Sequence, residues 1–459
     1  MKRYIIILIA FLFLPIFSHA ADWKTYPYTD PNSKIVFPND EGSHAPLKGL
    51  EWWYVVINAV GVTTGNKYSI LVTHFNNQFR FFTVTDVTQK THKSGTTVGV
   101  IDSKKGSLDV KQYTVYGTDY MRCKKGPDGS LVPFEYEFET NHSDMHIKGE
   151  LKSLKPPMLE GVTGYVPIGS SGYSWYYSLT RLQVNAVLTY EGITENISGL
   201  GWLDHQWGEF LISPVELFGM FETYEWFCVQ LDNGSDILIS NIYDRDYNLP
   251  YGGTYGGIQY FDSSGKTLPI LNSTFTRTGY WQDPVSKKYM SMGWTLDVPE
   301  IDLELTLTPE FTNQMVSFPL NGDFWEGSIS VTGTIGGVPV TGRSYGELMH
   351  QFEIPRLSVT VDNYPLKSVY RTDETIKAIW KVVNPDQGNP LAFDVELVSA
   401  SLKIPIAKGI QGNNIAFTLG NIVPAGSKIG IFRIKVTASS IDKVIQGNAF
   451  SPFLMKKIW

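Results

Sequence analysis

The sequence predicts a protein built almost entirely of β-strands. Of its 459 residues, 14% are aromatic and only 18% are charged. Apolar side chains fall in short alternating runs, as half-buried strands require, and do not form the stripes of amphipathic helices. The turn pairs Gly65-Asn66, Asn233-Gly234 and Gly336-Gly337 separate several of these runs and are typical of β-hairpins. A chain of this length is expected to hold two or three domains.

Residues 1–20 have the features of a secretory signal peptide. Lys2 and Arg3 precede an apolar run from Tyr4 to Phe17, and Ser18-His19-Ala20 supplies a small-x-small cleavage site. The apolar run is too short for a stable membrane anchor, and no cysteine comes directly after the cleavage site. We therefore expect a periplasmic or secreted protein without a transmembrane segment.

The rest of the chain divides into an arm and three domains. Residues 21–46 are polar and proline-rich and are expected to form an N-terminal arm over the body. Closely spaced strand-like runs in 47–212 predict a closed or nearly closed barrel of about eight to ten strands, which has room for a small apolar ligand. The pattern restarts in 213–353. Short strand-like runs in 356–459 predict a C-terminal immunoglobulin-like β-sandwich.

The net charge of the protein indicates which partners it can bind. Removing residues 1–20, which contain Lys2 and Arg3 but no acid, takes the formal net charge from −7 to −9. An acidic protein without a long basic run is a poor nucleic-acid binder, so no nucleic-acid partner is expected.

Cys123 and Cys228 are the two cysteines. An oxidising compartment would allow them to pair, but sequence alone does not place them within bridging distance, and free thiols are favoured.

The densest cluster of chemically active side chains is Gly199–Phe210, GLGWLDHQWGEF. In an extended strand, Asp204 and Gln206 point to one face and His205 and Trp207 to the other. An imidazole beside an indole, with a carboxylate one residue away, can hold a proton near an apolar ligand. The structural interpretation is a tryptophan-rich strand corner with a buried histidine, and the residues alone favour it.

Metal and nucleophilic chemistry find little support in the motifs. His142 and His146 form the closest histidine pair, but on a strand they would lie about 13 Å apart, too far to share an ion. His74 and His205 could meet across a barrel, although nothing in the sequence requires it. The chain has no G-x-S-x-G nucleophile motif, no P-loop and no dinucleotide fingerprint. We therefore expect no metal site and no cofactor.

Five motifs in a fixed order resemble the CrtC/AttH family of lipocalin-like proteins, which includes carotenoid 1,2-hydratase (hydroxyneurosporene synthase) and many secreted relatives labelled hydrolases. Together with weaker second-half matches they cover about residues 45–352. The motifs are EWWY at Glu51–Tyr54, YYSLTRL at Tyr176–Leu182, the stretch Gly199–Phe210, FWEGSISVTG at Phe324–Gly333 and GRSYGEL at Gly342–Leu348. The resemblance implies two lipocalin-like barrels packed together, with residues from about 356 onward outside it.

The resemblance also implies acid/base chemistry in an apolar pocket. The family's hydratases add water across an isoprenoid double bond, which needs a proton donor and a shielded carbocation. A buried carboxylic acid can stay protonated and serve as the donor, and aromatic faces can stabilise the cation. The expected catalytic residues are Asp204 as acid or orienting carboxylate, His205 as its partner, and Asp232 near the position of the family's acid. The expected ligand-contacting residues are Trp207, Trp202, Trp53, Tyr54, Tyr176 and Tyr177.

Other motif residues are expected to be structural. Glu51 and Glu326, each beside a tryptophan in a motif, would hold the barrel rims together, and Arg181 would pair with one of the motif acids.

Two functions of the protein remain open. One is cofactor-free hydration or isomerisation of a hydrophobic small molecule such as an isoprenoid or lipid, and the other is non-catalytic carriage of such a ligand. Asp204 or Asp232 facing an enclosed apolar cavity without a salt-bridge partner favours catalysis, whereas either acid bound to Arg181 or to backbone donors favours a carrier.

Overall fold

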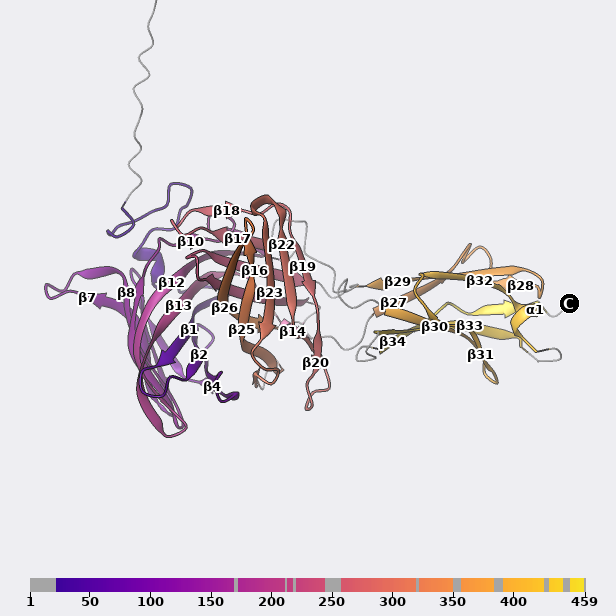
Figure 1. Ribbon diagram of the computed structural model, residues 1–459, viewed down its shortest axis with the longest axis horizontal. Coiled ribbons are helices and arrows are strands. Elements are labelled where there is room, and N and C mark those ends of the chain that lie inside the picture. Colours follow the sequence, from indigo (N-terminus) through magenta and orange to yellow (C-terminus); the bar gives the residue numbers. More distant parts are fainter. Residues whose placement is uncertain are drawn as a thin grey trace, which may run out of the picture.

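The chain folds into three successive β-rich units, seen from left to right in Figure 1. The structure is a computed structural model. It describes residues 22–168, 172–210, 213–217, 220–243, 257–318, 322–349, 356–383, 391–424, 429–440 and 446–457. Strands dominate all three units, and helical structure in the described part consists of short turns such as η1 (Asn39–Glu41), η3 (Pro299–Ile301) and α1 (Leu419–Ile422). The predicted all-β class is confirmed.

The first unit is a nearly closed barrel. Its 13-stranded sheet has the order β4-β3-β2-β1-β13-β12-β9-β8-β7-β6-β5, with β10 and β11 paired to β12. The strands are β1 (Leu50–Gly61), β2 (Lys67–Phe75), β3 (Phe79–Asp86), β4 (Thr91–Val98), β5 (Val100–Ser103), β6 (Asp109–Thr114), β7 (Gly117–Lys125), β8 (Leu131–His142), β9 (Met145–Ser153), β10 (Met158–Leu159), β11 (Tyr165–Ile168), β12 (Gly172–Tyr190) and β13 (Ile193–Glu209).

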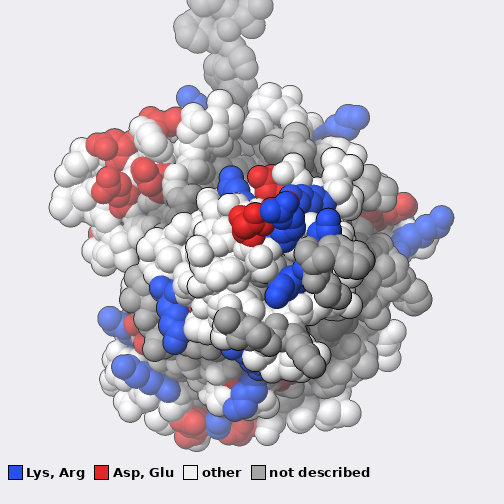
Figure 2. All heavy atoms as spheres, turned by 90° about the vertical axis from the view of Figure 1, so that its right-hand side faces the viewer, with Lys and Arg blue, Asp and Glu red and all other residues white. Residues whose placement is uncertain are grey.

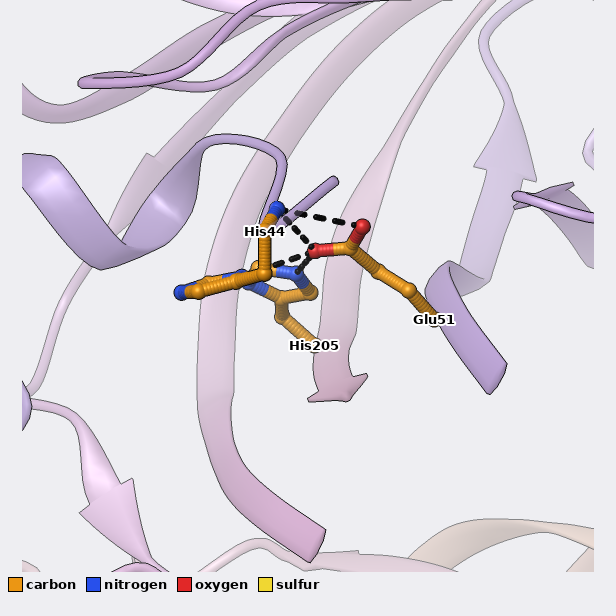
Figure 3. A group of neighbouring side chains, drawn as sticks. All are labelled: His44, Glu51 and His205. Carbon is orange, nitrogen blue, oxygen red and sulfur yellow. Dashed lines mark hydrogen bonds and ion pairs between the residues drawn. The ribbon is translucent and has the colours of Figure 1, made fainter. Parts of the chain in front are cut away.

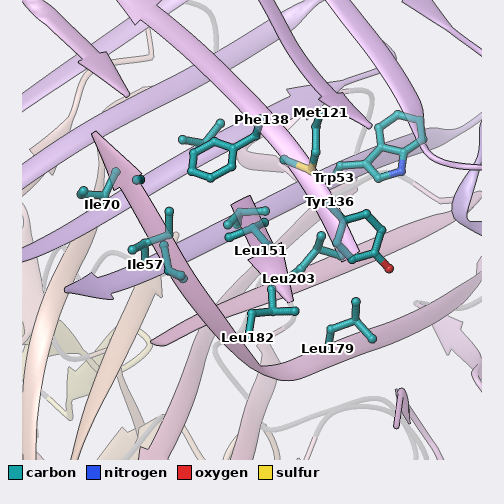
Figure 4. Close-up of a cluster of buried hydrophobic side chains, with 14 of the residues drawn as sticks. Trp53, Ile57, Ile70, Met121, Tyr136, Phe138, Leu151, Leu179, Leu182 and Leu203 are labelled. Atoms are coloured by element: carbon teal, nitrogen blue, oxygen red, sulfur yellow. The ribbon is translucent and has the colours of Figure 1, made fainter. Parts of the chain in front are cut away.

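The interior of this barrel is a packed apolar core, shown in Figure 4. Alternate side chains of each strand point inward, so Trp53, Ile57 and Leu203 meet residues from the opposite wall. The N-terminal arm completes the core. Phe37 is fully buried, with its ring 4.8 Å from that of Tyr177. The barrel is therefore filled by its own side chains and by the arm.

The second unit is a half-barrel, which corrects the expectation of a second complete barrel. Its 11-stranded sheet runs β18-β17-β16-β15-β26-β25-β23-β22-β19, with β14 on β15 and β24 on β25. The edge strands β18 and β19 are short and do not pair with each other in the described residues. The strands of the sheet are β14 (Ser213–Leu217), β15 (Met220–Leu231), β16 (Asp236–Tyr243), β17 (Gly257–Phe261), β18 (Thr267–Pro269), β19 (Thr274–Arg277), β22 (Trp294–Val298), β23 (Leu303–Pro309), β24 (Met315–Val316), β25 (Phe324–Ile335) and β26 (Val338–Leu348). A separate two-stranded sheet is formed by β20 (Tyr280–Gln282) and β21 (Tyr289–Ser291).

The barrel and the half-barrel pack together through an apolar layer, which we name the interface cluster. Its largest members, Trp202 of the first unit and Trp226 of the second, are almost fully buried. Polar contacts also cross the boundary, as where the Gln230 side-chain amide donates to the carbonyl oxygens of Thr180 and Gly201. The interface cluster consists of Tyr54, Val56, Leu71, Phe81, Met158, Val166, Tyr176, Trp202, Phe210, Trp226, Cys228, Leu238, Phe261, Val316, Phe318, Phe324, Tyr345 and Met349.

The third unit projects from the far side of the second (Figure 1). A three-stranded sheet, β27-β29-β32, and a six-stranded sheet, β28-β35-β33-β30-β31 with β34 on β33, share one apolar core. Viewed end-on, basic and acidic side chains lie beside one another on its surface (Figure 2). The immunoglobulin-like topology stays a prediction. The strands are β27 (Arg356–Val361), β28 (Val369–Tyr370), β29 (Thr375–Val383), β30 (Leu391–Val398), β31 (Lys403–Ile410), β32 (Asn414–Thr418), β33 (Ile431–Ser440), β34 (Gln446–Phe450) and β35 (Leu454–Lys456).

Two further expectations concern cysteines and membrane spans. Cys123 lies in the core of the first unit and Cys228 in the interface cluster, and both are buried free thiols. Burial raises the pKa of both thiols, which keeps them protonated and unreactive in the folded protein.

Within the described residues, no helix has the length and apolar character needed to cross a membrane. The proposed signal peptide, residues 1–20, lies outside the described residues.

Candidate functional site

Strand β13 carries the central motif, and its two faces serve different parts of the molecule. Asp204 pairs in register with Tyr54 of β1 and Ser178 of β12, whereas His205 pairs with Trp53 and Tyr177. Trp207 belongs to the barrel core and Trp202 to the interface cluster. The predicted alternation of side chains along this strand is therefore confirmed. It separates Asp204 from His205, so their expected partnership does not form.

Asp204 is a buried carboxyl group held by neutral donors. It accepts hydrogen bonds from the hydroxyls of Tyr176 at 2.6 Å and Ser178 at 2.5 Å, and from the Trp202 indole at 2.6 Å. Burial raises the pKa of Asp204 to about 7, although the three hydrogen bonds act in the opposite direction. Trp226 donates in turn to the Tyr176 hydroxyl at 3.1 Å. Asp204 can thus retain a proton near neutral pH at the junction of the two units.

A second pair of acids lies across the interface on β25 and β26. Glu326 and Glu347 are directly opposite each other in the antiparallel ladder, with Glu326 buried and Glu347 half-buried. Tyr54 of the first unit donates to Glu326 at 3.0 Å, and Tyr224 donates to Glu347 at 2.5 Å. Burial and then the charge of Glu347 raise the pKa of Glu326, and burial raises the pKa of Glu347 to about 7. The pair therefore holds at least one proton at neutral pH.

An apolar pocket opens beside this acid pair. It offers about 100 Å³ of space to water-sized molecules inside a wider, open depression. Its walls come from both units and are mostly aromatic, and Glu347 is the carboxylic acid among them. The lining residues are Leu50, Trp52, Tyr54, Phe75, Asn77, Phe79, Phe81, Tyr224, Phe318, Phe324, Glu347 and Met349. A mostly apolar cleft with a few polar groups at a junction between units is the usual form of a small-molecule site.

His205 belongs to a separate cluster inside the barrel, shown in Figure 3. Its Nε2 atom lies 3.2 Å from Oε1 of Glu51, and Nδ1 of His44 lies 2.8 Å from the same oxygen. Burial opposes ionisation of Glu51, but hydrogen bonds from His205 and His44 lower its pKa to about 2. Burial lowers the pKa of His205. Glu51 thus links β1, β13 and the arm, in keeping with the structural role expected for it.

The remaining predicted residues are divided between these locations. Of the six expected ligand-contacting side chains, Tyr54 lines the pocket, while Tyr176 and Trp202 lie behind it in the interface cluster. Trp53, Tyr177 and Trp207 are in the barrel core. They contact the His205 ring, at centroid distances of 4.7, 5.5 and 4.7 Å respectively, and so pack around the histidine cluster.

Asp232 is not part of a buried site. It is exposed in the turn between β15 and β16, where its carboxylate accepts hydrogen bonds from the backbone and hydroxyl of Thr341. The buried acid of that hairpin is Asp236, which accepts from Lys155 and Arg181, each at 2.7 Å. Arg181 therefore pairs with Asp236, an acid that lies outside the motifs. Asp232 fills the role of a turn residue.

Sequence reasoning missed Glu347 as an acid and His44 as a partner of His205. Glu347 is part of the GRSYGEL motif, but its position opposite Glu326 and beside an aromatic pocket depends on strand register and on packing between the units. His44 lies in the arm, outside every recognised motif. The proximity of the conspicuous residues His44 and Glu51, seven positions apart, is the signal that could have suggested a contact.

Comparison with known proteins agrees with this architecture. Residues 28–350 match the model of the AttH-like family. A crystal structure of an AttH-like protein from Nitrosomonas europaea superposes with a TM-score of 0.56 at 22% identity, covering 70% of this chain and 98% of that one. Kievitone hydratase from Nectria haematococca superposes with a TM-score of 0.51 at 17% identity, covering 71% and 98%. No curated protein matches the sequence. Because the family model spans well over half of the chain, the protein belongs to the AttH-like family.

Proposed function

We propose that this protein binds a hydrophobic small molecule, an isoprenoid or lipid, in the pocket between the barrel and the half-barrel. We further propose that it acts there as a cofactor-free hydratase or isomerase. The observation that carries the proposal is the position of Glu347, a half-buried carboxylic acid with a pKa raised to about 7, in the wall of an aromatic pocket. A hydratase of similar fold, kievitone hydratase, is consistent with this reaction class.

The acid pair supplies the proton that an unactivated double bond needs. Transfer of the Glu347 proton to one alkene carbon forms a C–H bond and leaves a carbocation on the neighbouring carbon. Aromatic faces of the pocket stabilise this cation. In hydration, water forms the C–O bond and returns a proton to the carboxylate. In isomerisation, an adjacent C–H bond loses the proton instead. Either route ends with the acid reprotonated and needs no oxidant or metal.

Asp204 has a supporting part in this proposal. It lies behind Tyr176, whose hydroxyl also accepts from Trp226. When Asp204 is ionised, its charge adds to the effect of burial and raises the pKa of Glu347. Asp204 thus favours the protonated form of the acid in the pocket wall. The two acids named in the sequence analysis do not themselves meet the criterion for catalysis. Asp204 is bound by side-chain donors and is not among the pocket-lining residues, and Asp232 accepts a hydrogen bond from the backbone N–H of Thr341. The case for catalysis therefore rests on Glu347.

Replacing Glu347 by glutamine should abolish turnover while leaving ligand binding intact. The amide keeps the size of the side chain but has no acidic proton, and general acid catalysis contributes on the order of 100-fold or more to rate. The measurement is incubation in D₂O of the apolar compound extracted from the protein, with mass spectrometry for the addition of water or of a solvent deuteron on carbon. Asp232→Asn, a change of a surface acid, serves as the matched control and should retain full activity.

Equal turnover by wild type and Glu347→Gln would remove Glu347 from the mechanism. Tight binding without turnover in the wild type would leave the carrier function in place of the enzyme.

We also propose that the protein is exported to the periplasm or beyond, on the basis of the signal-like residues 1–20. The mass of the protein recovered from its host should then lack this segment.

A further inference from the structure

Three potential ligand atoms converge where the N-terminal arm meets the barrel. They are Nδ1 of His44, Oε1 of Glu51 and Nε2 of His205, and all lie within 4.8 Å of one another. His44 comes from the arm, Glu51 from β1 and His205 from β13, and Figure 3 shows all three side chains turned toward one point. This cluster is on the opposite face of β13 from Asp204, so it is separate from the proposed catalytic pocket.

The spacing of these atoms is near that of a tetrahedral metal site. Zinc bonds to nitrogen and oxygen of about 2.0–2.1 Å place neighbouring ligand atoms about 3.3 Å apart. The two nitrogens lie 2.8 and 3.2 Å from Oε1 of Glu51, and all three atoms lie within 4.8 Å of one another. Binding an ion would require an adjustment of the His44 side chain. This side chain is 20% exposed and sits in the arm, so it can move more easily than the fully buried His205.

Groups behind the ligand atoms already have the arrangement of an outer coordination shell. Nε2 of His44 lies 3.4 Å from a carboxylate oxygen of Asp40, which orients the ring with Nδ1 toward Glu51. The second oxygen of Glu51 accepts from the Ser43 hydroxyl and the backbone N–H of His44. Histidine ligands in metal sites are commonly held by a carboxylate at the other ring nitrogen.

Stacked indoles fix the planes of both imidazole rings. Trp207 stacks on His44 with a centroid distance of 4.0 Å and an interplanar angle of 6°. Trp53 stacks on His205 at 4.7 Å and 18°. The rings therefore lose little freedom when they bind an ion, which lowers the entropic cost of coordination.

The buried negative charge of Glu51 also favours a bound cation. Its side chain is 1% exposed, and the ion-pair partners found for it in the described part of the chain are the two histidines. Buried carboxylates are normally paired with a cation or coordinate a metal. We propose that His44, Glu51 and His205 form a binding site for a borderline divalent metal ion, with Zn²⁺ as the natural occupant. This replaces our initial expectation of no metal site.

Two histidines and one carboxylate leave the fourth position of a tetrahedral ion open for water. Two nitrogen ligands and one oxygen ligand suit Zn²⁺. Ca²⁺ and Mg²⁺ prefer ligand sets made of oxygen atoms alone, so they fit this site poorly. A bound ion would tie the arm to the two central strands of the barrel. Its role is therefore to hold the arm over the barrel, and binding should stabilise the folded chain.

The test uses the full mature chain after dialysis against a chelator. Isothermal titration with Zn²⁺ should show one site per chain, and Co²⁺ should give the strong visible absorption of a four- or five-coordinate ion. His44→Ala should abolish both signals, and Asp40→Asn should weaken binding by about 10- to 100-fold. His146→Ala is the matched control, because His146 contacts Glu139 at 3.1 Å but belongs to no group of three ligand residues in the described part of the chain.

The thermal unfolding midpoint of wild type and His146→Ala should rise with added Zn²⁺, whereas that of His44→Ala should stay constant. Because His44 is partly exposed and belongs to the arm, the His44→Ala variant is expected to fold. Circular dichroism should be used to check its folding before the titration. Absence of Zn²⁺ and Co²⁺ binding by the wild type would overturn the proposal. Unchanged binding by His44→Ala would overturn it equally, since the ion would then be held elsewhere.

Discussion

Replacing Asp236 by asparagine should lower the free energy of unfolding by about 3–5 kcal/mol, the usual cost of removing one partner from a buried ion pair. Asp236 is fully buried and accepts from Lys155 at 2.7 Å, Arg181 at 2.7 Å and the Thr180 hydroxyl at 2.8 Å. Lys155 and Arg181 belong to the first unit and Asp236 to the second. The substitution would leave two cations without their counter-charge in the interface. Urea titration of tryptophan fluorescence measures the change.

Asp232→Asn is the matched control for this experiment. It makes the same chemical change four residues earlier in the same hairpin, but at an exposed turn bonded to Thr341. A surface substitution of this kind should change stability by no more than about 0.5 kcal/mol. If both variants lost the same small amount of stability, the Asp236 cluster would not hold the two units together.

The free energy of unfolding should fall by roughly 2 kcal/mol between pH 7 and pH 8.5. Burial raises the pKa of Asp204, Glu347 and Glu41 to about 7 and that of Glu160 to about 8. In the unfolded chain these carboxyls ionise near pH 4. The folded state therefore binds more protons than the unfolded state above pH 4, and this stabilisation is lost as pH rises through the folded pKa values. Buried neutral histidines act in the opposite direction, mainly below pH 7.

Urea titrations at a series of pH values test this expectation. Glu160→Gln should reduce the slope above pH 7 by about half, because the pKa of Glu160 is raised furthest of these four acids and its ionisation accounts for the largest share of the change. Glu150→Gln, which alters an exposed acid paired with Lys124, should leave the slope unchanged. Stability that is constant or rises from pH 7 to 8.5 would show that these buried acids are ionised in the folded protein.

Local pattern was enough to predict most of the fold. The two faces of β13 follow from the period-two geometry of strands, so the separation of Asp204 from Trp207 could be read directly from the sequence. The Asn233-Gly234 turn and the Gly336-Gly337 turn lie where the hairpins β15–β16 and β25–β26 turn. The family motifs identified the two joined units. The open half-barrel was not predictable, because closure depends on whether distant edge strands meet.

The candidate site was harder to predict because its acids come together through tertiary packing. Glu326 was assigned a structural role from its neighbouring tryptophan, yet register places it opposite Glu347 at the unit boundary. Asp232 and Asp236 lie in the same hairpin, and only the packing of Lys155 and Arg181 distinguishes the buried acid from the exposed one. His44 reaches His205 through the path of the arm, which contains no periodic pattern that would reveal it.

The central claim is that the pocket between the barrel and the half-barrel holds an apolar ligand. Native mass spectrometry of the mature protein purified from its own host, followed by organic extraction, tests it most directly. We predict a non-covalent isoprenoid or lipid adduct, released on extraction and present also in Glu347→Gln, whose pocket keeps its aromatic walls. An unloaded protein that also fails to bind a panel of isoprenoids and lipids would contradict both the enzymatic and the carrier function.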